Sequence, residues 1–157
     1  MQAMLATTRR LLSPPVLLAA MALLTWLTGP YPGWVVGPIA GQTAVALIVA
    51  AAGLALIGWA ALGFRRARTT VNPLDPERAT SMVRRGPYGL SRNPMYLADV
   101  FLLAAWTIHL GAPAGLLWIA VFVYWIDRLQ IPAEEAALQR RFGDDYKRYR
   151  EQVRRWL

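Results

Sequence analysis

A short arginine-rich stretch, residues 84–96, combines groups that could bind an anion. It reads Arg-Arg-Gly-Pro-Tyr-Gly-Leu-Ser-Arg-Asn-Pro-Met-Tyr. Asn93 is a good N-cap and Pro94 suits the first position of a helix, so we expect a helix to begin here. The free N–H groups and positive dipole end of that helix, beside Arg92, would form a natural anion site. The alternative interpretation is a helix start flanked by arginines that face the cytoplasm.

Three carboxylates in or beside apolar segments are further candidates. Glu134 and Glu135 could accept hydrogen bonds from hydroxyl groups or balance a ligand cation, although acids in a first helical turn also stabilise the helix dipole. Asp99 lies within an apolar segment, where an ionisable side chain is a functional candidate. We favour a structural pair between Asp99 and Arg128. A single histidine, His109, with no cysteine in the chain predicts no metal site.

The elements that would position these residues are apolar enough to lie in a membrane. Hydrophobic residues make up 56% of the 157 residues. No charged residue occurs in residues 11–64, which can hold two spans of about 20 residues each. A Gly- and Pro-rich turn separates them, so we expect spans at about 14–27 and 35–62. A cleavable signal peptide is the competing interpretation of the first.

Charge distribution decides how the second half crosses the membrane. Residues 100–126 carry no Asp, Glu, Lys or Arg and could form one helix or a hairpin. With a hairpin, all 17 Lys and Arg residues lie on one side of the membrane, as the positive-inside rule favours. We therefore expect spans at about 94–110 and 114–131, a cytoplasmic loop at 65–93, and both termini in the cytoplasm.

The last segment, 132–157, is expected to be a cytoplasmic tail. Its apolar side chains recur every three or four residues and predict one amphipathic helix at the membrane surface: Phe142, Tyr146, Tyr149, Val153 and Trp156. The predicted fold class is all-α, a single integral membrane domain, 1–157, with about four spans. The net charge of +8 then points to anionic lipid rather than to nucleic acid.

Two motifs resemble those of the isoprenylcysteine carboxyl methyltransferase and phospholipid methyltransferase superfamily. The first is Gly-Pro-Tyr at 86–88 followed by Arg-Asn-Pro-Met-Tyr at 92–96. The second runs from Glu134-Glu135 through Phe142-Gly143 to Val-Arg-Arg-Trp at 153–156. Their order and the hydrophobic hairpin between them carry the resemblance, from about Val83 onward. Arg154 stands where relatives usually have proline.

The resemblance implies an enzyme that uses S-adenosyl-L-methionine at the cytoplasmic face. Arg92 and Glu135 would be catalytic, and the tail would cover the cofactor. The implied cofactor-binding residues come from both motifs: Tyr88, Arg92, Asn93, Pro94, Tyr96, Glu134, Glu135 and Tyr146. Arg92 suits the carboxylate of such a cofactor, a glutamate its ribose diol or amino group, and the tyrosines its adenine or sulfonium.

The acceptor is expected to be lipid-like or prenylated, with its tail against Leu103 and Trp106. An isoprenylcysteine carboxylate is the first choice, since it is already nucleophilic, and a phospholipid amine is the second. A sterol-type reductase and a non-catalytic lipid-binding module are the alternatives of other classes. The expected location is the bacterial inner membrane, and the sequence leaves the oligomeric state open.

Overall fold

A computed structural model describes residues 13–29, 40–67 and 82–157 of the chain, and in these parts every regular element is a helix. This agrees with the predicted all-α class. The elements, in chain order, are α2 (Pro14–Thr28), α3 (Gln42–Arg66), the 3₁₀ turn η2 (Gly86–Gly89), α4 (Pro94–Leu110), α5 (Gly115–Trp125), the π-helical turn η3 (Ile126–Gln130), α6 (Ile131–Phe142) and α7 (Asp144–Gln152).

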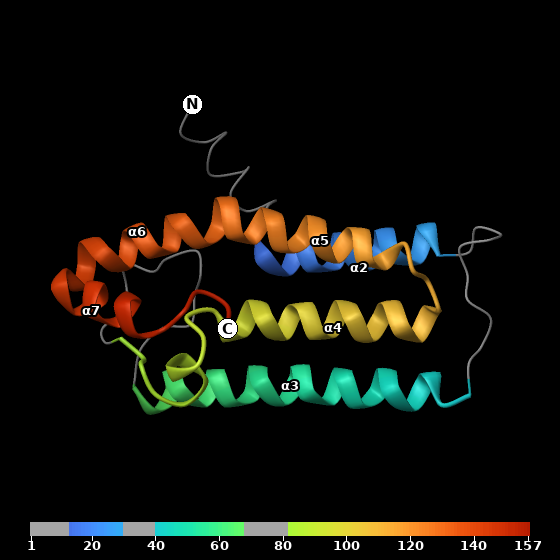
Figure 1. Cartoon of the computed structure of the whole chain (residues 1–157), viewed down its shortest axis with the longest axis horizontal. Helices are drawn as coiled ribbons and strands as arrows, with labels where there is room; N and C mark the ends of the chain where they lie inside the picture. The colour runs from blue at the N-terminus through green and yellow to red at the C-terminus, as the bar shows by residue number, and fades with distance from the viewer. Residues whose placement is uncertain (1–12, 30–39, 68–81) are drawn as a thin grey trace.

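The four long helical segments lie side by side, with α4 between α3 and the α2–α5 pair (Figure 1). Gly53 permits the close approach of α3, because a Cβ there would lie 3.1 Å from the Ala98 carbonyl oxygen of α4. The buried core includes Leu17, Leu103 and Phe122, contributed by α2, α4 and α5. Because α4 is central, its contacts with α2, α3 and α5 fix where both of its ends lie.

Many large hydrophobic side chains lie on the outer surface of the helices. On α3, Leu47, Ile48 and Leu54 are each at least 60% exposed, an arrangement typical of a lipid-facing helix. Two helices are long and apolar enough to cross a membrane, Gln42–Arg66 and the continuous Gly115–Phe142. The other two apolar helices, α2 and α4, have 15 and 17 residues.

Residue 131, the expected end of the fourth span, is not the end of a helix. The helix continues through η3 directly into α6, past Pro132. Proline has no N–H to donate and its ring crowds the preceding turn. The wider π turn just before Pro132 relaxes the regular hydrogen-bond pattern there, so the chain passes the proline without leaving the helix.

The tail is not the single amphipathic helix that its periodicity predicts. Gly143 has φ +52° and separates α6 from α7, and the chain is not helical beyond Gln152. Tyr146 and Tyr149 are buried on α7, whereas Val153 and Trp156 lie in the irregular segment that turns back toward α4. The tail therefore folds onto the helix bundle.

One end of the bundle gathers the polar parts of the molecule. The N-terminal ends of α2 and α4, the C-terminal end of α3, and α6 with α7 lie at this end (Figure 1). The Lys and Arg residues of the described segments lie on elements at or next to it. The predicted starts of the spans at 14 and 94 agree with α2 and α4, while residues 35–39 lie outside the described segments.

Candidate functional site

A cavity of about 340 Å³ opens at the polar end of the bundle, within the size range of small-molecule sites. Its walls come from α2, α3, α4, α6 and α7 together with η2. It is lined by all eight residues that were expected to hold a cofactor: Tyr88, Arg92, Asn93, Pro94, Tyr96, Glu134, Glu135 and Tyr146. The fold thus brings the two motifs to one place.

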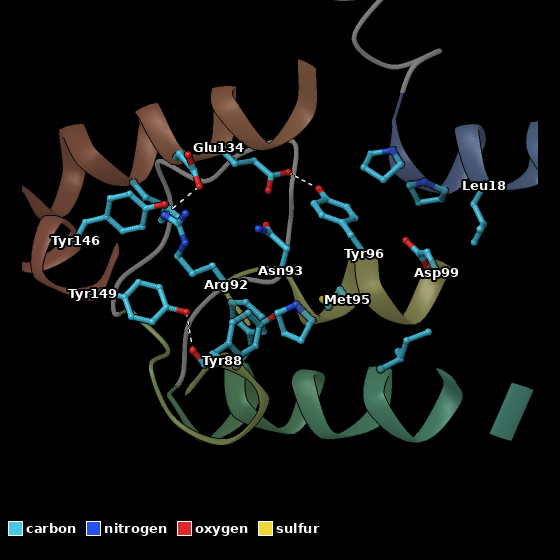
Figure 2. A pocket seen from close by; sticks show the side chains of 17 residues that line it. Leu18, Tyr88, Arg92, Asn93, Met95, Tyr96, Asp99, Glu134, Tyr146 and Tyr149 are labelled. Atoms are coloured by element: carbon cyan, nitrogen blue, oxygen red, sulfur yellow. Dashed lines mark hydrogen bonds and ion pairs between the residues drawn. The ribbon is translucent and has the colours of Figure 1, made fainter. Parts of the chain in front are cut away.

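Arg92 points a buried, partly unsatisfied guanidinium group at this cavity (Figure 2). Its side chain is 11% exposed, and its Nη1 lies 3.1 Å from Glu135 Oε1. This contact of Nη1 is an ion pair without hydrogen-bond geometry, and Nε makes no hydrogen bond within the described segments. The Tyr146 hydroxyl lies beside the same group. Unpaired buried N–H groups are costly, so Arg92 is suited to an incoming anion.

Glu134 is held by neutral donors. Its Oε1 accepts hydrogen bonds from the Tyr96 hydroxyl at 2.5 Å and the Gln130 side-chain amide at 2.6 Å. These bonds orient the carboxylate along the cavity wall, where Figure 2 shows it between Arg92 and Tyr96. The position suits hydroxyl or ammonium groups of a ligand.

Glu135, in contrast, belongs to an ion-pair network with the tail. Arg155 donates from Nη2 to Glu135 Oε2 at 2.8 Å and from Nε to Oε1 at 3.3 Å. The same arginine contacts Asp127 at 3.2 Å, and Trp156 Nε1 donates to Asp127 at 3.0 Å. With Arg155 and Arg92 both beside it, Glu135 is placed to anchor the tail rather than to act as a free base.

The tail is also fixed by hydrogen bonds to the start of α4. The backbone N–H of Arg92 donates to the backbone carbonyl of Arg154 at 2.9 Å. The side-chain amide of Asn93 donates to the backbone carbonyl of Arg155 at 2.9 Å. Asn93 occupies the N-cap position of α4, as predicted, but its side chain makes no cap bond to that helix. Arg154 contributes a carbonyl that any residue type supplies, so arginine can replace proline here.

Three buried tyrosines, from η2 and α7, close one side of the cavity. The Tyr149 hydroxyl donates to the Tyr88 carbonyl at 2.7 Å, which ties α7 to η2. Burial raises the pKa of Tyr146 to about 12 and also raises the pKa values of Tyr88 and Tyr149. At neutral pH their hydroxyls stay protonated, so these tyrosines offer neutral donors and aromatic faces, not bases.

The two residues expected to contact the acceptor's tail do not reach this cavity. Leu103 is 2% exposed and belongs to the core, and Trp106 Nε1 donates to the Ala22 carbonyl at 3.0 Å. Both side chains serve the packing of α4 against its neighbours, because α4 is the central helix. The apolar wall includes Leu138 of the second motif and residues that the sequence did not single out: Pro14, Pro15, Leu18, Ile57 and Phe64.

The expected pair between Asp99 and Arg128 is also absent. Arg128 lies 3.9 Å from Asp127 and over the ring of Tyr124, whereas Asp99 lines the cavity. Sequence reasoning missed Asp127 as a tail anchor and Tyr149 as a lining residue. Tyr149 was recognisable as part of the second motif, but the pairing of Asp127 with Arg155 joins residues too distant in sequence to be foreseen.

Comparison with known proteins assigns the chain to a protein family. A family model described as "Phospholipid methyltransferase" matches residues 41–145. An uncharacterized protein of Haemophilus influenzae is 44% identical over 63 residues, which are 40% of this chain and all of that protein. No solved structure matches the chain. The family match spans the first motif and the glutamate pair of the second.

Proposed function

The chain belongs to the phospholipid methyltransferase family, and from this premise we propose that it is an S-adenosylmethionine-dependent methyltransferase acting on a lipid-like acceptor. The observation that carries the proposal is the buried Arg92 guanidinium, which lines the cavity and whose Nε makes no hydrogen bond within the described segments. A cationic donor of this kind suits the carboxylate of the cofactor.

The remaining lining residues fit the other parts of that cofactor. Glu134 is placed to accept hydrogen bonds from a ribose diol or an amino group, and the faces of Tyr88 and Tyr146 suit an adenine ring or a cationic sulfonium. When bound, the cofactor supplies an electrophilic methyl group. The protein's part is to orient the reactants and, through the anchored tail, to keep water away from them.

We place the active site at the cytoplasmic face of a bacterial inner membrane, with four spans and both termini inside. The clustering of the described Lys and Arg residues at the cavity end of the bundle supports this orientation. The apolar wall from α2 and α3 would let a lipid reach the cavity from the side.

Two acceptor chemistries are compatible with this machinery. A prenylcysteine-type carboxylate, the choice favoured by the sequence, needs no general base. An amine must first lose a proton. Base-labile label on the product would identify a methyl ester, and base-stable label would identify an N-methyl group. A non-catalytic lipid-binding module remains the alternative of another class, and such a module would not bind S-adenosylhomocysteine.

The experiment is a titration of the purified protein, in lipid nanodiscs, with S-adenosylhomocysteine by calorimetry. Arg92→Ala should weaken binding by roughly 2–3 kcal/mol, because it removes a charge-assisted contact. Arg85→Ala is the matched control, since Arg85 is an exposed arginine in the same connection and does not line the cavity. Wild-type protein that binds no S-adenosylhomocysteine, or equal affinities of both variants, would contradict the proposal.

A further inference from the structure

Asp99 is an acidic side chain in the part of the cavity that faces the apolar wall. It lies on α4 one turn beyond Met95, and both line the cavity. Figure 2 places Asp99 beside Leu18 of α2, on the opposite side of Tyr96 from Arg92 and Tyr146. The cavity thus has two regions, one near the tail that holds Arg92 with the two glutamates and one near α2 that holds the carboxylate of Asp99.

No basic group of the described segments neutralises Asp99. Arg92, the arginine of the cavity, is paired with Glu135, and Arg128 is engaged with Asp127 and Tyr124. Figure 2 places the apolar Leu18 beside Asp99, and the other residues that α2 and α3 contribute to the wall are apolar too. A carboxylate in such surroundings is costly unless a positive group pairs with it. Within the described segments, Asp99 therefore lines the cavity without a charge partner.

We propose that Asp99 binds the ammonium group of the methyl acceptor, so that this enzyme selects an amine-bearing lipid over a carboxylate. The inference rests on the proposed function, because it assigns the opposite region, at Arg92 and Glu134, to the cofactor. An acceptor carboxylate at Asp99 would meet a like charge in an apolar setting. The assignment reverses the order of acceptors that the sequence favoured.

The same carboxylate can serve the chemistry of an amine. An ammonium nitrogen has no free electron pair until it loses a proton, and that proton would pass to an oxygen of Asp99. The nitrogen keeps the electron pair and forms its bond to the methyl carbon, while the carbon–sulfur bond breaks and its pair stays on sulfur. The proton then leaves Asp99 for solvent, which returns the site to its starting state.

The test measures lipid binding without any turnover. Native mass spectrometry compares lysophosphatidylethanolamine with its N-acetyl derivative, which has the same tail and phosphate but no ammonium group. Wild-type protein should prefer the amine by roughly tenfold, as expected for one charge pair at partly buried contact. Asp99→Asn should abolish the preference and Asp99→Glu should restore part of it. Asp144→Asn is the control, because Asp144 is exposed on α7 and does not line the cavity.

A second arm separates this inference from the proposed function. Asp99→Asn should raise the KM for the amine lipid at least tenfold and leave the affinity for S-adenosylhomocysteine within about twofold of wild type. An unchanged amine preference in Asp99→Asn, or methyl transfer to farnesylated cysteine alone, overturns the role of Asp99. A loss of S-adenosylhomocysteine affinity in Asp99→Asn overturns it too, by placing Asp99 in the cofactor region. If the wild-type protein prefers the amine lipid but transfers no methyl group, the role of Asp99 in binding ammonium is supported and the proposed methyltransferase activity is contradicted.

Discussion

At the scale of single residues, the two adjacent glutamates have different tasks. Glu134 receives hydrogen bonds from neutral groups and remains available to a ligand, while Glu135 is buried between Arg92 and Arg155. Removing one partner of a largely buried ion pair leaves the other charge uncompensated, which costs more than the pair itself contributes. Substitution of these two adjacent glutamates should therefore affect different properties of the protein, stability for Glu135 and ligand binding for Glu134.

We expect Glu135→Gln to lower the free energy of unfolding by roughly 1–3 kcal/mol, because two arginines lose a charged acceptor. Glu134→Gln should instead weaken S-adenosylhomocysteine binding with little effect on stability. Tryptophan fluorescence during denaturant unfolding and calorimetric titration measure the two quantities. Glu151→Gln, at an exposed position of α7, is the control. The assignment is wrong if Glu135→Gln is as stable as the control.

The residue types and their order were enough to predict the cavity lining, but not every contact. Tyr88, Arg92 and Glu134 were predicted because they stand in motifs. The partner of Asn93 could not be predicted, since a helix-start pattern favours a local cap and the real acceptor is the Arg155 carbonyl. Leu103 lies in the core and does not line the cavity, which could not be predicted because a helical period does not say which neighbour each face meets.

At the scale of the elements, helix positions were predictable and helix ends were less so. The spans expected at 14–27 and 94–110 correspond to α2 and α4 because Pro14 and Pro94 mark their first turns. Pro132 does not begin a separate helix in the same way, since a π turn just before it lets the helix run through. The break at Gly143 depends on a positive φ. The apolar period of the tail continues across this glycine and so does not indicate the break.

Helix packing at the far end of the bundle depends on the absence of a side chain at Gly115. A Cβ on Gly115 would lie 2.8 Å from Thr25 Cγ2 and would also collide with the Thr107 hydroxyl. We expect Gly115→Ala to destabilise the protein by roughly 1–3 kcal/mol, because overpacking forces the helices apart. The midpoint of thermal unfolding in detergent measures this.

The control for that prediction is Gly58→Ala on α3. A Cβ on Gly58 would meet nothing within 4 Å, and alanine is the better helix former. This variant should unfold at or above the wild-type temperature. Equal unfolding temperatures for the two variants would mean that α2, α4 and α5 are not packed as closely as described.

At the scale of the whole molecule, charge separates the two ends. The cavity end carries the basic residues of the described segments, while the opposite end holds the connection from α4 to α5. Composition and the positive-inside rule were enough to predict this one-sided arrangement. They could not predict that the tail would fold back, because its hydrogen bonds to Arg92 and Asn93 join distant parts of the chain.

The orientation can be measured with single cysteines, because the chain has none of its own. Pro113→Cys lies at an exposed position between α4 and α5, and Gln152→Cys lies at the exposed end of α7. In intact bacterial cells an impermeant maleimide should label Pro113→Cys and should reach Gln152→Cys only after permeabilisation. Labelling of Gln152→Cys in sealed cells would contradict a cytoplasmic active site.

Methyl transfer itself tests the central claim most directly. Purified protein in nanodiscs of bacterial lipid is incubated with S-adenosylmethionine labelled in its methyl group, and the label is counted in the extracted lipid. We predict that wild-type protein labels the lipid. The Arg92→Ala variant, once circular dichroism has shown that it is folded, should label the lipid at least tenfold more slowly. The account would be contradicted by folded wild-type protein that transfers no label, or by an Arg92→Ala variant that transfers label at the wild-type rate.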